Sequence, residues 1–194
     1  MPKSEAEILD SVMQLTGISS SDLQNVLSYF ERKDFKKKTT LITAGETTKE
    51  VYLILKGCIR LYHIKEGNDI SICFFTEGIF CGYYDSFVSG QPGGYYMETL
   101  EDCTVLALSH QNYRKLFDEF PGMQEFTLKI VEERFTAMQQ LFTTQLLQTP
   151  EERYLQLQKN RPDLLNRIPQ HQIATYLGVT PVSLSRIRKR SLKK

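Results

Sequence analysis

Residues 168–190 read IPQHQIATYLGVTPVSLSRIRKR, and this stretch indicates the architecture of the C-terminal part of the chain. Ile173 and Leu177 lie four residues apart, so they share one face of a short helix. Gly178 suits the left-handed backbone that ends a helix, because glycine adopts this conformation at little cost. Thr180 suits the N-cap of a second helix. The pattern predicts two short helices around a tight turn, which is a helix-turn-helix.

On the second of these helices, Leu184 and Ile187 are expected to face inward, and polar and basic side chains are expected to face outward. We predict that the residues contacting DNA are Gln170, Thr180, Val182, Ser183, Ser185, Arg186 and Lys189. Arg186 matches the two acceptors on a guanine edge, and Val182 is expected to touch a thymine methyl. Thr180, Gln170 and Lys189 are expected to contact phosphates, while Ser183 and Ser185 assist the base reading.

The distribution of charge supports a nucleic-acid partner. Residues 153–194 contain ten of the 24 Lys and Arg and one of the 23 acidic residues, which is a net charge of +9. The remaining 1–152 contains 14 basic and 22 acidic residues, which is −8. A charge run is usually a solvated face. On a helix-turn-helix, however, a basic patch is typical of a phosphate-binding surface, so the partner expected here is double-stranded DNA.

The rest of the composition is that of an ordinary soluble protein, expected in the cytoplasm. The start MPKSEAEILD is polar and acidic, so no secretory signal is expected, and no apolar run approaches the ~18 residues of a membrane span. The cysteines, at positions 58, 73, 81 and 103, form no C-x-x-C pair. We expect buried, reduced thiols; a metal or iron–sulfur site is the alternative.

Along the chain the pattern changes from helix to strand and back. Two helical pieces are expected within residues 5–30, and Gly17 ends the first. Short β-branched and aromatic runs then predict strands at 34–41, 51–55, 58–64, 70–75, 95–98 and 104–109. Strands this short, separated by turns, favour an antiparallel jelly roll or barrel. A short helix is expected at 111–120.

A long helix is expected from about 123 to 147. The apolar residues Leu128, Val131, Phe135, Met138 and Phe142 recur in steps of three and four, which is typical of a coiled-coil seam. They could all pack on the β-domain, but a second apolar stripe beside them favours a homodimer through this helix. A capping box at Thr149 and Glu152 begins a new helix. The predicted domains are therefore a β-barrel domain with N-terminal helices (1–122), a dimerisation helix (123–148) and a helix-turn-helix domain (149–194), an α+β fold.

This order of elements resembles the Crp/Fnr family of bacterial transcription regulators. The residues that carry the resemblance are Gly45-Glu46, residues 51–57 with Arg60, Phe80-Cys81-Gly82, Ile173-Ala174, residues 178–180 and residues 184–187. The resemblance implies a cyclic-nucleotide-binding-like sensor domain. It also implies a homodimer on inverted-repeat DNA and contact with RNA polymerase.

The sequence departs from the cyclic-nucleotide binders of that family at the phosphate site. They carry a Gly-Glu pair and then an Arg followed by a small residue, whereas here Gly82 precedes Tyr83 and residues 93–96 read GGYY. Residues 66–113 contain no Lys or Arg against seven acids. Because a buried anion needs a paired cation or several aligned N–H donors, we predict no cyclic AMP binding in the usual mode. Backbone N–H groups at 93–94 remain an alternative donor set.

Other sensor chemistries have weaker signals. The aromatic residues that could line a pocket for an unidentified effector are Phe80, Tyr83, Tyr84, Tyr95 and Tyr96, with Phe87 nearby, although core packing is the more ordinary role. Iron–sulfur members use cysteines near the N-terminus, and the first here is Cys58. A haem held by His63 and a cysteine is a remote alternative. We therefore expect no metal and no cofactor.

An enzyme is not expected. A cupin-like barrel enzyme needs clustered His and Glu ligands, whereas His63, His110 and His171 are far apart in the pattern. No nucleophile elbow, phosphate-binding loop or metalloprotease motif is present. The alternative function is a barrel sensor or scaffold that signals through protein contacts rather than DNA.

Overall fold

The computed structural model describes residues 4–191, so Lys193 and Lys194, which contribute to the C-terminal charge, lie outside the described residues. The chain divides into two compact units. The first consists of Met1–Leu61 and Phe75–Arg134, and the second of Tyr62–Phe74 and Phe135–Lys194. The domain boundaries at 122 and 148 that the sequence suggested stay a prediction.

The first unit begins with two helices, as the sequence predicted. Helix α1 spans Glu5–Thr16 and α2 spans Ser20–Leu27. Ser4 and Glu7 form a capping box at the start of α1. Gly17 ends α1 with a φ of 71°, the left-handed conformation predicted for it.

Within residues 4–191, eight strands form two four-stranded sheets. The strands are β1 (Glu31–Phe35), β2 (Thr40–Ile42), β3 (Glu50–Lys56), β4 (Ile59–Lys65), β5 (Asn68–Phe75), β6 (Phe80–Cys81), β7 (Tyr96–Thr99) and β8 (Cys103–Ser109). Their order is β1-β8-β3-β6 in one sheet and β2-β7-β4-β5 in the other. The pairs β1–β8, β3–β8, β3–β6 and β2–β7 are antiparallel. This confirms the predicted antiparallel β-domain of an α+β fold.

Three features of the β-domain differ from the prediction. The strand expected at 34–41 is two strands, because Lys38 has a φ of 67° and the Thr39 N–H bonds to the Lys36 carbonyl in a turn. The two-residue strand β6 was not predicted. Helix α3 (Tyr84–Ser89) was also missed, and the left-handed Gly90 ends it. Its six residues are too few for the apolar period to reveal a helix.

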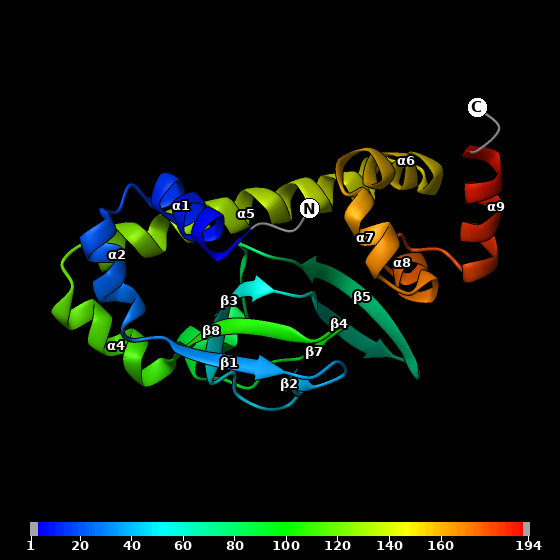
Figure 1. Cartoon of the computed structure of the whole chain (residues 1–194). Helices are drawn as coiled ribbons and strands as arrows, with labels where there is room; N and C mark the ends of the chain where they lie inside the picture. Colours follow the sequence, from blue (N-terminus) through cyan, green and yellow to red (C-terminus); the bar gives the residue numbers. More distant parts are fainter. Residues whose placement is uncertain (1–3, 192–194) are drawn as a thin grey trace. The chain divides into compact units, whose positions relative to one another are not determined.

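The hydrophobic core of the first unit lies between the helices and the first sheet. Its buried residues are Ile8, Val12, Leu23, Val26, Leu53, Leu55, Phe87, Leu108, Tyr113, Leu116, Met123 and Phe126. In Figure 1 the helices α1, α2 and α4 (His110–Glu119) lie together at one end of the strands. The helices therefore cover the sheet with their apolar faces, as the sequence pattern required.

Helix α5 spans Met123–Leu147, the range predicted for the long helix. Its buried residues, Met123 and Phe126, are in its first turn. Beyond that turn it leaves large apolar side chains exposed: Leu128, Phe135, Met138, Phe142, Leu146 and Leu147. Val131 is half-buried. None of the helices within 4–191 combines the length and apolar character that a membrane crossing requires.

The second unit contains the C-terminal helices α6 (Pro150–Asn160), α7 (Pro162–Arg167), α8 (Gln170–Tyr176) and α9 (Pro181–Ser191). The capping box of Thr149 and Glu152 is present at the start of α6. Residues 161–163 end α6 as predicted, but they also begin another helix, because Pro162 occupies the first turn of α7.

Candidate nucleic-acid interface and sensor region

The turn of the helix-turn-helix has the local geometry that its sequence predicted. Gly178 has a φ of 69°, and the N–H of Val179 donates to the carbonyl of Ala174 at 2.9 Å. The Thr180 hydroxyl accepts a hydrogen bond from the N–H of Ser183 at 3.2 Å and so caps α9. The turn therefore joins α8 and α9 with a backbone hydrogen bond at the end of α8 and a side-chain cap at the start of α9.

The two helices pack through the residues expected to face inward. Ile173, Ala174 and Leu177 on or beside α8 are at most 2 % exposed, and Leu184 and Ile187 on α9 are at most 4 % exposed. These contacts make α8 and α9 a single packed body, because each buried aliphatic side chain stabilises the pair by about 1.5–3 kcal/mol.

Six of the seven predicted DNA contacts are exposed: Gln170, Thr180, Val182, Ser185, Arg186 and Lys189. Val182 is 62 % exposed, although it is apolar. Ser183 is half-buried, and its hydroxyl accepts from Thr180 at 3.0 Å, so it is already engaged in the cap. The DNA contacts themselves stay a prediction.

At least three cations counted in the basic segment have partners within the protein; one of them, Arg190, lies 3.4 Å from a carboxylate oxygen of Glu151. Arg153 donates to main-chain carbonyls of Gln148 and Leu177. Arg161 pairs with Asp163 at 3.0 Å. A sum of charges along the sequence does not reveal these roles, because it does not show which side chains have partners within the protein.

The hairpin of β4 and β5 supplies a second group of residues to the second unit. Thr175 on α8 donates its hydroxyl to Ser71 Oγ at 3.1 Å and accepts the Ser71 N–H at 3.2 Å. The rings of Phe74 and Tyr176 lie with their centroids 5.2 Å apart. Burial raises the pKa of Tyr176. The sequence carried no signal for this contact, since the partners lie far apart along the chain.

The aromatic residues predicted for an effector pocket do not share one environment. Tyr83 packs edge-on against Tyr95, with centroids 5.0 Å apart. Phe80 packs at an angle against Phe126 at 6.0 Å, within the hydrophobic core. The Tyr84 hydroxyl lies 3.1 Å from that of Tyr113. Tyr96 is a half-buried residue of β7.

Gly93 lies against Tyr83. A Cβ atom at residue 93 would overlap ring carbons of Tyr83, so the glycine allows a close approach. The Gly93 N–H donates to the carbonyl of Glu46 at 3.2 Å, and its carbonyl accepts from Gly45 at 2.7 Å. The backbone donor that could have replaced a cation at residue 93 is therefore already bonded inside the protein.

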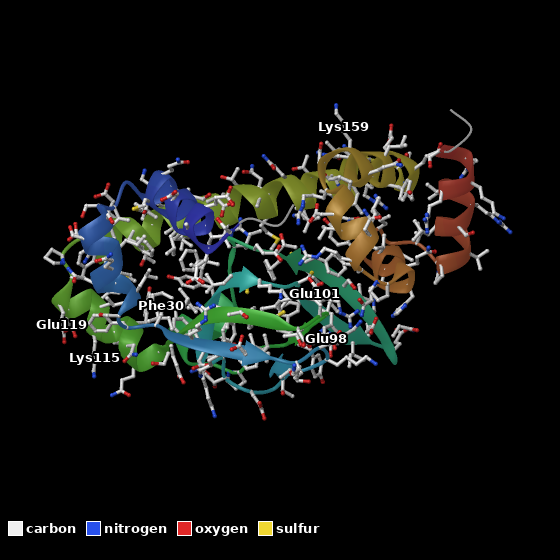
Figure 2. All side chains as sticks on the ribbon, in the orientation of Figure 1. Phe30, Glu98, Glu101, Lys115, Glu119 and Lys159 are labelled. Atoms are coloured by element: carbon white, nitrogen blue, oxygen red, sulfur yellow. The ribbon has the colours of Figure 1, made fainter. Side chains whose placement is uncertain are left out.

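Sequence analysis also missed a buried cation in the first unit. Arg60 on β4 is 2 % exposed and pairs at 2.8 Å with Glu98 on β7, which is labelled in Figure 2. Arg60 lies outside residues 66–113, the acidic stretch that contains no Lys or Arg. Its position between Ile59 and Leu61 in an apolar strand was the available signal. The two opposite charges neutralise each other, so the charge of Arg60 is already balanced by the carboxylate of Glu98.

The cysteines are free thiols, as expected, but their burial differs. Cys58, Cys81 and Cys103 are buried, whereas Cys73 is half-buried. Burial raises the pKa of Cys103 to about 11 and raises that of Cys81 further. Between residues 4 and 191, no three His, Cys, Asp or Glu side chains gather closely enough to hold a metal ion.

Comparisons with known proteins agree with this architecture. Residues 32–120 match the cyclic nucleotide-binding domain family. The chain is 26 % identical over 112 residues to the cAMP-activated global transcriptional regulator CRP of Pasteurella multocida, covering 57 % of this chain and 54 % of the relative. It thus spans about half the length of the curated relatives it matches.

Solved structures show the same fold over most of the chain. The c-di-GMP responsive regulator CLP of Xanthomonas campestris has a TM-score of 0.73 at 14 % identity, covering 90 % of this chain and 92 % of its own. A structure from Eubacterium rectale assigned to the Crp/Fnr family has a TM-score of 0.71 at 14 % identity, with coverage of 91 % and 85 %. The β-domain thus matches the cyclic nucleotide-binding domain family, and the whole chain is similar in fold to a solved regulator assigned to the Crp/Fnr family.

Proposed function

We propose that this chain is a sequence-specific DNA-binding transcription regulator and not an enzyme, acting in the cytoplasm as a homodimer on an inverted-repeat operator. The observation that carries the proposal is the capped helix-turn-helix, whose second helix exposes Arg186 and Lys189 on a positively charged segment. Such a helix enters the major groove, where exposed basic side chains meet base edges and phosphates.

The exposed apolar residues of α5 support the homodimer. A monomer that left Leu128, Phe135 and Phe142 in water would expose a contiguous apolar stripe. Pairing with a second copy buries this stripe, since the same residues recur at heptad spacing. Two recognition helices would then reach successive major grooves about 34 Å apart, which predicts an inverted repeat.

The division of labour on DNA follows from side-chain chemistry. Arg186 reads a guanine through its O6 and N7, and Val182 touches a thymine methyl. Gln170, Thr180 and Lys189 hold phosphates, which fix the register without reading the sequence. Ser183 and Ser185 assist. RNA polymerase is the further partner that the resemblance to the Crp/Fnr family implies.

The contacts in the sensor region support a regulator that does not bind cyclic AMP in the way usual for the family. Tyr83 occupies the space beside Gly93, the Gly93 N–H is used by Glu46, and Arg60 is paired with Glu98. The related proteins named above respond to different ligands, cAMP and c-di-GMP, so the fold alone does not set the effector. Isothermal titration with cyclic AMP and cyclic GMP is expected to give no heat of binding at micromolar concentrations; saturable binding of either nucleotide would contradict this part of the proposal.

DNA binding is tested by fluorescence anisotropy on duplexes obtained by selection from random sequence. We expect selected duplexes to be inverted repeats, and affinity for random DNA to fall steeply with salt, because phosphate contacts release counterions. If the protein bound no duplex at low ionic strength, the alternative of a barrel sensor acting through protein contacts would take its place.

A further inference from the structure

We propose that Arg153 is a positioning residue for operator recognition, which fixes the orientation of the helix-turn-helix relative to the end of α5. The inference deepens the proposed function and rests on it. Arg153 is not assigned a contact with DNA. It acts through three main-chain carbonyls, two from the end of α5 and one from the turn between α8 and α9.

The guanidinium of Arg153 joins these segments directly. Its Nη1 donates to the carbonyl of Gln148 at 2.6 Å and to that of Gln145 at 3.3 Å. Its Nη2 donates to the carbonyl of Leu177 at 2.8 Å, the residue that caps α8. One side chain from the first turn of α6 thus ties the C-terminal end of α5 to the C-terminal end of α8.

A second bond runs between the same two helix ends. The Gln145 side chain donates its Nε2 to the carbonyl of Tyr176 at 2.9 Å. Gly178 lies beside this contact, because a Cβ at residue 178 would be 3.5 Å from Arg153 Nη2 and 4.0 Å from Gln145 Oε1. The glycine therefore serves the left-handed turn and also borders the junction.

The choice of arginine has a physical reason. The last carbonyls of a helix lack intrahelical partners and carry the negative end of the helix dipole, so a cation between two such ends is stabilised by both. The planar guanidinium holds several donors in a fixed fork, whereas a lysine ammonium is a single point on a flexible stem. Arginine can therefore define an angle between two helices as well as a distance.

This angle matters because α8 and α9 are packed against each other. Leu184 and Ile187 bury α9 against α8, so whatever fixes the end of α8 also fixes the recognition helix. In a dimer joined through α5, the separation and direction of the two recognition helices then depend on the Arg153 junction. If the hydrogen bonds of Arg153 are lost, the protein should discriminate less between operators of different half-site spacing. Its affinity for an isolated half-site should change less.

Two other roles for Arg153 make different predictions. A phosphate contact would contribute equally to every duplex, because contacts to the DNA backbone carry no sequence information, and it would respond to any loss of charge. A purely structural role would lower the melting temperature without changing which spacing is preferred.

The test compares Arg153→Lys and Arg153→Met with Lys159→Met. Lys159 is an exposed cation on the same helix α6 and supplies the matched control for loss of one charge (Figure 2). Affinities are measured by anisotropy for the selected inverted repeat, for repeats with the spacer changed by one and two base pairs, and for an isolated half-site. Dimerisation and melting temperature are recorded for each variant.

We expect Arg153→Lys and Arg153→Met to weaken binding to the preferred spacing by about tenfold or more, as loss of charge-assisted hydrogen bonds typically does. Half-site affinity should change by less than about threefold, so the spacer preference flattens. Lys159→Met should lower all affinities by one common factor. Gln145→Ala, which alters an exposed side chain, should flatten the preference partly and remains informative if Arg153→Met fails to fold.

A retained spacer preference in folded Arg153→Lys and Gln145→Ala would overturn the inference while leaving the proposed function intact. Equal losses on half-site and full operator would also overturn it and would indicate a phosphate contact. If the unaltered protein bound no duplex, or bound all spacings alike, the proposed function itself would fail and the inference with it.

Discussion

The ring of Tyr83 lies against the backbone of Gly93, at a distance that leaves no room for a Cβ atom at residue 93. The two residues meet because the loop after α3 returns to the start of that helix. Tyr95 packs edge-on against the same ring. The space beside the backbone of Gly93 is therefore occupied by the ring of Tyr83.

We predict that Gly93→Ala destabilises the protein by about 1–3 kcal/mol, the usual cost of overpacking. Gly94→Ala is the matched control, because a Cβ there meets nothing within 4 Å. Urea denaturation of both variants provides the measurement. In the background of Tyr83→Ala the cost of Gly93→Ala should largely disappear, since the ring that it would overlap is gone. Equal costs in both backgrounds would show that the two residues are not coupled.

The Arg60–Glu98 pair should be far more sensitive than a surface pair. Arg60→Leu leaves a largely buried carboxylate without its partner, so we expect a loss of about 3–5 kcal/mol in unfolding free energy. Arg32→Leu, which breaks the exposed Arg32–Glu5 pair at 2.9 Å, should cost at most about 1 kcal/mol. Similar losses for the two variants would mean that the burial of Arg60 carries no special cost.

Replacing Arg186 and Lys189 should separate base reading from phosphate binding. Arg186→Ala should cost about 1–3 kcal/mol on the selected operator and relax the preference at one base position. Lys189→Ala should weaken all duplexes alike and reduce the salt dependence. Anisotropy titrations on selected and scrambled operators measure both effects. Equal losses on both duplexes for both variants would refute this assignment.

The capping box of α6 should make the stability of this helix depend on acid pH. The N–H of Thr149 donates to the Glu152 carboxylate at 2.7 Å and keeps the pKa of that group below its ordinary value of 4.5. The stabilisation is therefore complete at neutral pH and is lost as the pH falls through the lowered pKa. The melting-temperature difference between the protein and Glu152→Gln should shrink from about pH 7 to about pH 3; a constant difference would contradict this.

The thiols should react in two classes. Cys73 is half-buried, while Cys58, Cys81 and Cys103 are buried. At about pH 8 a thiol with a pKa of about 11, as in Cys103, is ionised in roughly one molecule in a thousand, so it reacts slowly. Maleimide labelling followed by mass spectrometry should show one fast site in the folded protein and four in denaturant. Two or more fast sites in the folded protein would contradict the burial of the other three.

Local sequence was sufficient for the elements whose ends are set by neighbouring residues. Gly17 and Gly178 end helices with a left-handed backbone, and Thr149 and Thr180 cap the helices that follow. These interactions span at most about five residues, so the order of residues along the chain already contains them. The same short range explains why the long helix was predicted at 123–147 and why α8 and α9 could be placed from their apolar spacing.

Tertiary structure alone decided which polar groups meet. Arg60 and Glu98 are separated by 38 positions, Ser71 and Thr175 by 104, and Arg153 and Leu177 by 24. From the sequence, Arg153 was one of the cations of a basic segment, but in the folded chain its guanidinium contacts the carbonyls at two helix ends. Propensity and spacing describe neighbours along the chain, whereas these contacts depend on which surfaces the buried apolar faces bring together, and only the folded chain specifies that.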